Sequence, residues 1–212
     1  MSENYPLDIA IAWTSDLSSY EEELKVAIQN CAKQLNNCNF HVLGDSGHLI
    51  NNLTADKILS HTVGMDQYYG WVIDPETYAS ITSGIIEDGR YDNVIVLTHQ
   101  RIIHNPDDNP FEFSSKRGNL ISLVDYRTRN DIQKVATLAL NHAMGHMFIG
   151  DRYHHCKYSW CDMTLSFSPG RIRDLAEIEG DETLYSFCEQ CEEIIRASEY
   201  WSDEPSTVSI EF

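Results

Sequence analysis

Basic residues are scarce in this chain of 212 residues. Its 15 lysines and arginines stand against 33 aspartates and glutamates, which gives a formal net charge of −18 at pH 7. Such a charge repels phosphate backbones and anionic lipids, which argues against non-specific binding to nucleic acids or membranes. No segment approaches the roughly 20 consecutive apolar residues of a membrane-spanning helix. The N-terminus also lacks the basic and apolar regions of a signal peptide, so we expect a cytosolic protein.

Internal repeats, low-complexity tracts and long Gly/Ser linkers are also missing. With 42% hydrophobic residues, the chain can bury a sizeable core. The length suits a single domain over residues 1–212, with an N-terminal subdomain at 1–149 and a C-terminal subdomain at 150–212.

Apolar periodicity predicts an alternation of strands and helices. We expect strands at Asp8–Trp13, Phe40–Leu43, Asn93–Leu97 and Asn119–Tyr126, and helices at Tyr20–Leu35, Thr54–Ser60, Pro75–Asp88, Asp131–Ile149 and Cys191–Trp201. The polar stretch His104–Arg117, which contains two prolines, is expected to be a loop. The order of elements predicts an α/β (α+β) fold, with a mixed sheet packed against helices. The helix at Asp131–Ile149 is apolar on nearly all sides and should be buried, and Gly150 is placed to end it.

Two histidines on this expected helix, His142 and His146, are four residues apart. That spacing puts both imidazoles on one face, where they can share a metal ion. The alternative is a pair of buried histidines satisfied by hydrogen bonds. The glycines nearby and the following His154-His155-Cys156 favour metal binding, because a third nitrogen donor can reach back beyond the end of the helix.

Four of the six cysteines form two close pairs, Cys156-x4-Cys161 and Cys188-x2-Cys191. Two short loops that each present two sulfurs are typical of a tetrahedral zinc site. Disulfides are the alternative, which a reducing cytosol disfavours. Cys31 and Cys38 lie far from this cluster in sequence, and we expect them to be ordinary half-buried thiols.

The segment Asn141–Cys191 resembles the archaemetzincins, a branch of the metzincin zinc metallopeptidases. Their motif runs HExxHxxGxxHC, four residues, CxM, about seventeen residues and CxxC. The resemblance implies a metzincin-like fold with a twisted mixed sheet, a buried active-site helix and a small zinc-stabilised C-terminal subdomain. It also implies two zinc ions, one held by three histidines and one structural ion held by Cys156, Cys161, Cys188 and Cys191. By position, His142, His146 and His155 are the three histidine ligands, and Met163 is the methionine of the Met-turn.

The spacing departs from the family pattern in two places. The interval from His146 to the His-Cys pair is three residues longer, and Gly150 falls one residue late, so His154 stays an alternative third ligand. The interval from Met163 to Cys188 is 24 residues. A longer loop costs little free energy, so this difference leaves the four-cysteine prediction intact.

Ala143 occupies the position of the catalytic glutamate. In a zinc peptidase that carboxylate takes a proton from the attacking water and passes it to the leaving amine, whereas alanine can do neither. General acid–base catalysis typically contributes about 10²–10⁴ in rate. We therefore expect a metallopeptidase that binds metal and peptide but cuts poorly or not at all. The alanine fits either a natural pseudoprotease or a substitution introduced to silence the enzyme, and the completeness of the other elements favours the second.

The expected substrate is a peptide or protein. In metzincins the strand that borders the cleft pairs with the substrate backbone, and Asn119–Tyr126, the last expected strand before the histidine helix, is the best candidate. Its other role is simply that of an edge strand. The alternative function is a pseudoprotease that uses the zinc cleft to hold a peptide or protein partner. Tyr153, Tyr158 and Trp160 could line a side-chain pocket or pack a small C-terminal core.

Overall fold

The computed structural model describes residues 5–44, 62–66, 70–73, 90–99, 101–102, 112–115, 118–123, 128–150, 156–158, 161–163 and 187–210. Of these, 62–66, 70–73, 101–102, 112–115 and 118 are described by their backbone. The helices expected at Thr54–Ser60 and Pro75–Asp88 lie outside the described residues.

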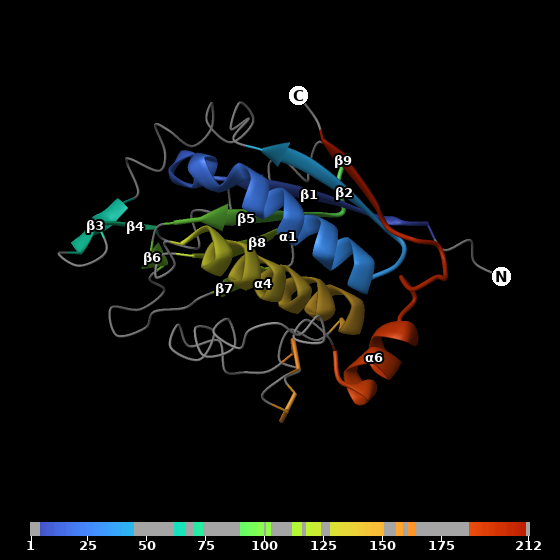
Figure 1. Ribbon diagram of the computed structural model, residues 1–212. Helices are drawn as coiled ribbons and strands as arrows, with labels where there is room; N and C mark the ends of the chain where they lie inside the picture. Colours follow the sequence, from blue (N-terminus) through green and yellow to red (C-terminus); the bar gives the residue numbers. More distant parts are fainter. Residues whose placement is uncertain are drawn as a thin grey trace.

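A six-stranded sheet forms the centre of the molecule (Figure 1). Its strands are β1 (Leu7–Trp13), β2 (Cys38–Gly44), β5 (Asn93–Thr98), β7 (Glu112–Ser115), β8 (Gly118–Ser122) and β9 (Thr207–Ile210), in the spatial order β7-β8-β5-β1-β2-β9. Every neighbouring pair is parallel except β7 and β8, which form an antiparallel pair. A second, three-stranded sheet contains β3 (Thr62–Asp66), β4 (Gly70–Ile73) and β6 (Arg101–Ile102), in the order β3-β4-β6.

Two long helices, α1 (Glu21–Gln34) and α4 (Arg129–Ile149), lie across one face of the large sheet (Figure 1). A short 3₁₀ helix, η1 (Ser15–Tyr20), leads into α1, and α6 (Glu189–Arg196) lies beyond the end of α4. Three glutamates in the first turn of α1 complement the positive end of the helix dipole. Glu23 from this turn pairs with Arg129 at the start of α4, with Oε1 and Nη1 2.8 Å apart.

The core lies between this sheet face and the two helices. Alternate residues of β1 (Ile9, Ile11 and Trp13) pack there with Leu24 and Ile28 of α1 and with apolar side chains of α4. The intervening residues, Ala10 and Ala12 of β1 and Val94 and Val96 of β5, are also buried. Burial on both faces is the usual state of parallel strands, and it explains the continuous apolar sequence of β5.

The ends of α4 are fixed by residues just outside its apolar stretch. The Thr128 side chain accepts a hydrogen bond from the Asp131 backbone N–H, which satisfies one of the free donors at the N-terminus. Gly150 ends the helix in the left-handed conformation, at φ 70°, and its N–H donates to the His146 carbonyl. Within these bounds, Leu138 to His146 form a continuously buried stretch.

Asn37 ties the end of α1 and the start of β2 to the C-terminal part of the chain. It is a non-glycine residue with φ 62°, a conformation that asparagine tolerates better than most residues. Its side-chain Nδ2 donates to the Tyr200 carbonyl at 2.8 Å, and its backbone N–H donates to the Glu204 carbonyl at 2.8 Å. These bonds bring β9 alongside β2.

The structure corrects three expectations. The stretch His104–Arg117 is not all loop, because Glu112–Ser115 forms β7, whose hydrogen bonds to β8 outweigh the loop-forming prolines that precede it. The strand expected at Asn119–Tyr126 is β8, and it is not at the edge, because β7 covers its outer side. Cys31 and Cys38 are not half-buried but 0% and 1% exposed, since both belong to the core under α1.

Two further findings concern the C-terminal part of the chain and membrane-spanning helices. Although residues 150–212 were expected to form a C-terminal subdomain, β9 adds to the sheet of the N-terminal part. Among the residues that the structure describes, no helix has the length and apolar character needed to cross a membrane.

Candidate metal centres

Helix α4 brings His142 and His146 together on one face, one turn apart. Their side chains are almost fully buried, and their Nε2 atoms lie 2.9 Å apart. Two ring nitrogens bound to one zinc ion at tetrahedral angles are separated by about 3.3 Å, given Zn–N distances of roughly 2.0–2.1 Å. If the two Nε2 atoms moved slightly further apart, both rings could therefore bind the same zinc ion.

The orientation of His142 is fixed from its other ring nitrogen. His142 Nδ1 lies 2.7 Å from the backbone carbonyl oxygen of Asp162. Because a carbonyl can only accept, Nδ1 carries the proton, and Nε2 of the neutral ring keeps its lone pair. The same Nε2 then accepts from His146 Nε2. A metal ion between the rings would take the place of that proton, a pattern usual for metal-binding histidines held by a carbonyl.

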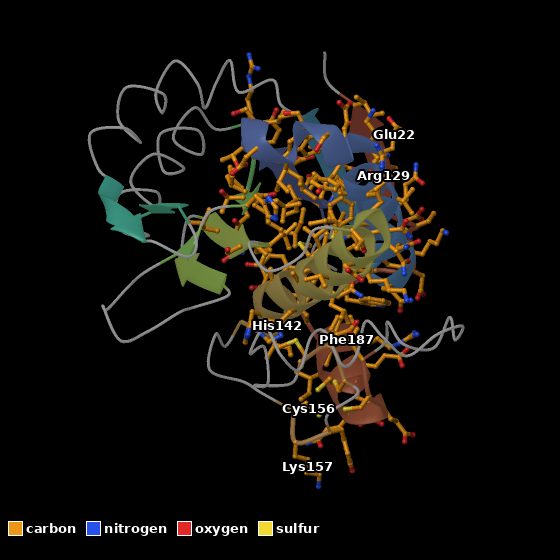
Figure 2. All side chains as sticks on the ribbon, turned by 60° about the vertical axis from the view of Figure 1, so that its left-hand side comes forward. Glu22, Arg129, His142, Cys156, Lys157 and Phe187 are labelled. Atoms are coloured by element: carbon orange, nitrogen blue, oxygen red, sulfur yellow. The ribbon has the colours of Figure 1, made fainter. Side chains whose placement is uncertain are left out.

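Met163 lies under this part of α4. Its side chain is 0% exposed, and a Cβ added to Gly145 would lie only 2.3 Å from the Met163 sulfur and 3.0 Å from Phe187 Cε1. Gly145 therefore allows Met163 and Phe187 to approach the helix backbone between the two histidines. Figure 2 shows His142 on α4, with Phe187 and Cys156 in the region below the helix.

The four cysteines of the two predicted pairs come together. The Sγ atoms of Cys156, Cys161, Cys188 and Cys191 all lie within 4.8 Å of one another, an arrangement that could hold a metal ion. Three of the four residues are buried and Cys156 is half-buried. All six cysteines are free thiols in this structure.

Backbone contacts hold these thiols in place. The Cys188 N–H donates to Cys161 Sγ at 3.3 Å, and the Tyr158 N–H donates to Cys156 Sγ at 3.4 Å. The Cys156 N–H in turn donates to the Met163 carbonyl at 2.6 Å. The cluster is thus built from three separate segments, and the middle one, 161–163, also reaches α4.

Burial changes how readily these thiols lose their protons when no cation is present. Burial raises the pKa of Cys161 to about 12, and burial together with the neighbouring thiols raises the pKa of Cys191. Burial also opposes ionisation of Cys188, but hydrogen bonds from the Cys191 backbone and the neighbouring thiols outweigh it and lower the pKa. A divalent cation would stabilise all four thiolates at once, and four sulfur ligands in this arrangement are typical of zinc.

Ala143 follows His142 on α4 and is 1% exposed, as part of the hydrophobic core. The two candidates for a third histidine ligand, His154 and His155, lie outside the described residues, as do Tyr153 and Trp160. Tyr158 is described and is 41% exposed, so it does not pack a small core. Sequence analysis missed Asp162 and Phe187. Both residues are neighbours of predicted site residues, Asp162 between Cys161 and Met163 and Phe187 directly before Cys188, and this adjacency was their signal in the sequence.

Comparison with solved structures finds two that are similar to this chain. Archaemetzincin from Methanopyrus kandleri matches with a TM-score of 0.58 and 16% sequence identity, over 93% of this chain and 97% of that chain. A zinc-dependent peptidase from Methanocorpusculum labreanum matches with a TM-score of 0.49 and 14% identity, over 88% of this chain and 99% of that chain. Scans against protein-family models and curated proteins found no match. The archaemetzincin resemblance, which rests on Asn141–Cys191 in the sequence, thus extends to the fold of nearly the whole chain, and this chain has the archaemetzincin fold.

Proposed function

We propose that this chain is a zinc metallopeptidase of the archaemetzincin type whose hydrolytic step is lost or strongly impaired. The observation that carries the proposal is the histidine pair. Its two Nε2 atoms converge on one point of a buried helix, and a carbonyl fixes the tautomer of His142 so that Nε2 can bind a metal. Without a metal, the hydrogen bond between the two rings holds both nitrogens at the place where the ion would bind.

His155, or alternatively His154, would complete the set of three histidines. When bound there, zinc would polarise the carbonyl of a peptide bond. The chain's own contribution is to hold His142 and His146 in place, through the Asp162 carbonyl and through Met163 beneath Gly145. The second ion, in the four-cysteine cluster, would be structural, since four protein ligands leave no position open for a substrate.

Ala143 is the reason to expect a low rate of peptide hydrolysis. Without a carboxylate at this position, no side chain of the helix takes the proton of the attacking water. The expected rate loss is about 10²–10⁴, the usual contribution of general acid–base catalysis. Metal and peptide binding need no such group and should persist.

The strand that would pair with the substrate is β7 rather than β8. Among the strands that the structure describes, β7 is the last on its side of the sheet, and its partner β8 is hydrogen-bonded on both sides. An extended peptide that adds to a sheet needs a strand with free backbone groups on one side. The edge position of Glu112–Ser115 supports this assignment.

A natural pseudoprotease is the second candidate, and the burial of Ala143 favours it. The alanine methyl group is packed in the core, where an ionised glutamate would be costly unless it were hydrogen-bonded. Such a protein would hold a peptide or protein partner in the metal cleft and release it unchanged. Six reduced thiols suit the cytosol, which we propose as the location in either case.

The first test is zinc content per chain, on protein purified without an affinity tag or chelator. We compare the parent with a His142→Ala/His146→Ala double variant, and with His41→Ala as a control because His41 lies on β2, away from α4. The proposal predicts two ions per chain in the parent and the control, and one in the double variant. An unchanged single ion would refute the histidine centre and reduce the function to a zinc-stabilised binding module.

The second test separates the two candidates. Ala143→Glu should create hydrolysis of a broad peptide library that a chelator abolishes, if the parent protein is a silenced peptidase. A variant that binds two zinc ions and still cleaves nothing would refute the peptidase and support the pseudoprotease.

A further inference from the structure

Asp162 is a buried carboxylate between the two candidate metal centres. Its residue is 1% exposed, and its Oδ2 accepts a hydrogen bond from Nδ2 of Asn141, which is 0% exposed, at 2.7 Å. Burying an acidic side chain is costly unless hydrogen bonds compensate for the lost water. Neither residue belongs to the cysteine and histidine sets, so both call for a separate explanation.

Asp162 contacts two consecutive residues of α4. The carboxylate binds the Asn141 side chain, and the backbone carbonyl of the same residue binds His142 Nδ1, also at 2.7 Å. Consecutive helical residues point in directions about 100° apart, because the helix has 3.6 residues per turn. Asp162 therefore holds the helix from two directions, and the side-chain contact fixes the carbonyl that orients His142.

The neighbours of Asp162 connect it to the four-cysteine cluster. Cys161 supplies a cluster sulfur that accepts from the Cys188 N–H, and the Met163 carbonyl accepts from the Cys156 N–H. The Met163 side chain lies against Gly145. Residues 161–163 thus contact the cysteine cluster through Cys161 and the Met163 carbonyl, and they contact α4 through Asp162 and the Met163 side chain.

From these contacts we infer that Asp162 is a positioning residue for the histidine centre. Its carboxylate, through Asn141, holds its carbonyl against His142 Nδ1, and so sets the tautomer and the orientation of the metal-binding ring. The inference rests on the proposed function, because it assigns His142 to a metal. Partners that orient a metal ligand typically change metal affinity by about 10–100-fold.

The test uses the full chain and two measurements. The first is the nuclear magnetic resonance signal of the His142 ring Nδ1–H in metal-free protein, assigned by its absence in His142→Gln. The second is titration with Co²⁺. Thiolate-to-cobalt charge-transfer absorption reports the four-cysteine centre, and visible absorption without that band reports a second ion held by nitrogen ligands.

Asp162→Ala should abolish the protected ring signal and weaken binding of the second cobalt by about 10–100-fold, with the thiolate band unchanged. Asn141→Ala removes the same hydrogen bond from the helix side and should do the same, which keeps the test decisive if Asp162→Ala does not fold. Asp162→Asn keeps an oxygen acceptor and should restore both measurements. Asp203→Ala, at an exposed aspartate, should match the parent.

The inference is overturned if Asp162→Ala or Asn141→Ala folds, keeps the His142 ring signal and binds the second cobalt as tightly as the parent. Failure of the proposed function gives a different result, because the parent itself then binds no cobalt outside the thiolate centre. In that case the ring signal still decides whether Asp162 positions His142, since it requires no metal.

Discussion

Replacing Gly145 with alanine should have opposite effects on stability depending on residue 163. In the parent, the new Cβ would lie 2.3 Å from the Met163 sulfur and 3.0 Å from Phe187 Cε1. Met163 is fully buried, so its side chain cannot retreat into solvent. In a Met163→Ala background the sulfur is gone, and the methyl group enters the space that it leaves.

The magnitude follows from two opposing terms. Alanine is more favourable than glycine within a helix by about 0.8–1.0 kcal/mol. Overpacking a well-packed core costs about 1–3 kcal/mol. We therefore expect Gly145→Ala to destabilise the parent by about 1 kcal/mol. In the Met163→Ala background, itself destabilised by about 2–5 kcal/mol, the same change should stabilise by up to about 1 kcal/mol.

Urea denaturation of the parent, Gly145→Ala, Met163→Ala and the double variant, at one fixed free zinc concentration, measures these free energies of unfolding. Fixed zinc is needed because a bound metal contributes to apparent stability. The cycle should show a coupling energy of about 2 kcal/mol between positions 145 and 163. Additive effects, or a parent that is stabilised by Gly145→Ala, would refute the close packing of Met163 beneath α4.

Three other predictions concern stability. Asn37→Ala should lower the free energy of unfolding by about 2–3 kcal/mol, because it loses the side-chain bond to the Tyr200 carbonyl and puts alanine at φ 62°. Asn37→Gly loses the same bond but tolerates this φ, so it should cost about 1 kcal/mol. Equal losses in urea denaturation would contradict the separate contributions of the bond and the backbone. Burial raises the pKa of Cys38 to about 12, so the folded chain keeps a proton that the unfolded thiol, with a pKa near 9, releases as the pH rises. The free energy of unfolding should therefore fall above about pH 9, and this thiol should account for about 1.4 kcal/mol of the loss at pH 10. Cys38→Ala should make the dependence of that free energy on pH shallower, and an unchanged dependence would exclude Cys38 as its source. Thr128→Ala should lower the free energy of unfolding by about 1 kcal/mol through loss of the α4 N-cap, and Thr128→Ser should restore most of that loss. Identical melting temperatures for the parent and both variants would show that the cap contributes nothing.

Strands β1, β2, β5 and β8 of the large sheet and the two long helices were predictable because their signals are local. The helix expected at Asp131–Ile149 is α4, which begins two residues earlier at Arg129, after the Thr128 cap. The continuous apolar run at Asn93–Leu97 is the buried strand β5. Periodicity and capping residues act over a few positions, so the sequence alone contains them.

The missed elements depend on partners far away in sequence. β9 has only four residues, all exposed, and its place is fixed by β2, which lies more than 160 residues earlier in the chain. β7 forms because β8 offers it a partner, although the prolines before it predict a loop. No local pattern states which strand a short polar segment will join.

The same contrast holds for the candidate site. The spacing of His142 and His146 and of the cysteine pairs predicted which side chains lie together, and the structure places His142 beside His146 and the four cysteines beside one another. The predicted third histidine lies outside the described residues. The roles of Asp162 and Asn141 could not be read in this way. One contact uses a backbone carbonyl, which every residue has, and the other joins two polar residues 21 positions apart.

The segment 161–163 also determines where the chain can change in length. Each of its three residues has a separate partner: the cysteine cluster for Cys161, Asn141 and His142 for Asp162, and Gly145 for Met163. An insertion or deletion of one residue here would move every later side chain to the wrong partner. The additional residues that distinguish this chain from the archaemetzincin motif fall on either side of the segment, before Cys156 and after Met163. These contacts require the three residues of the segment to be contiguous, so its length is fixed by three separate partners at once.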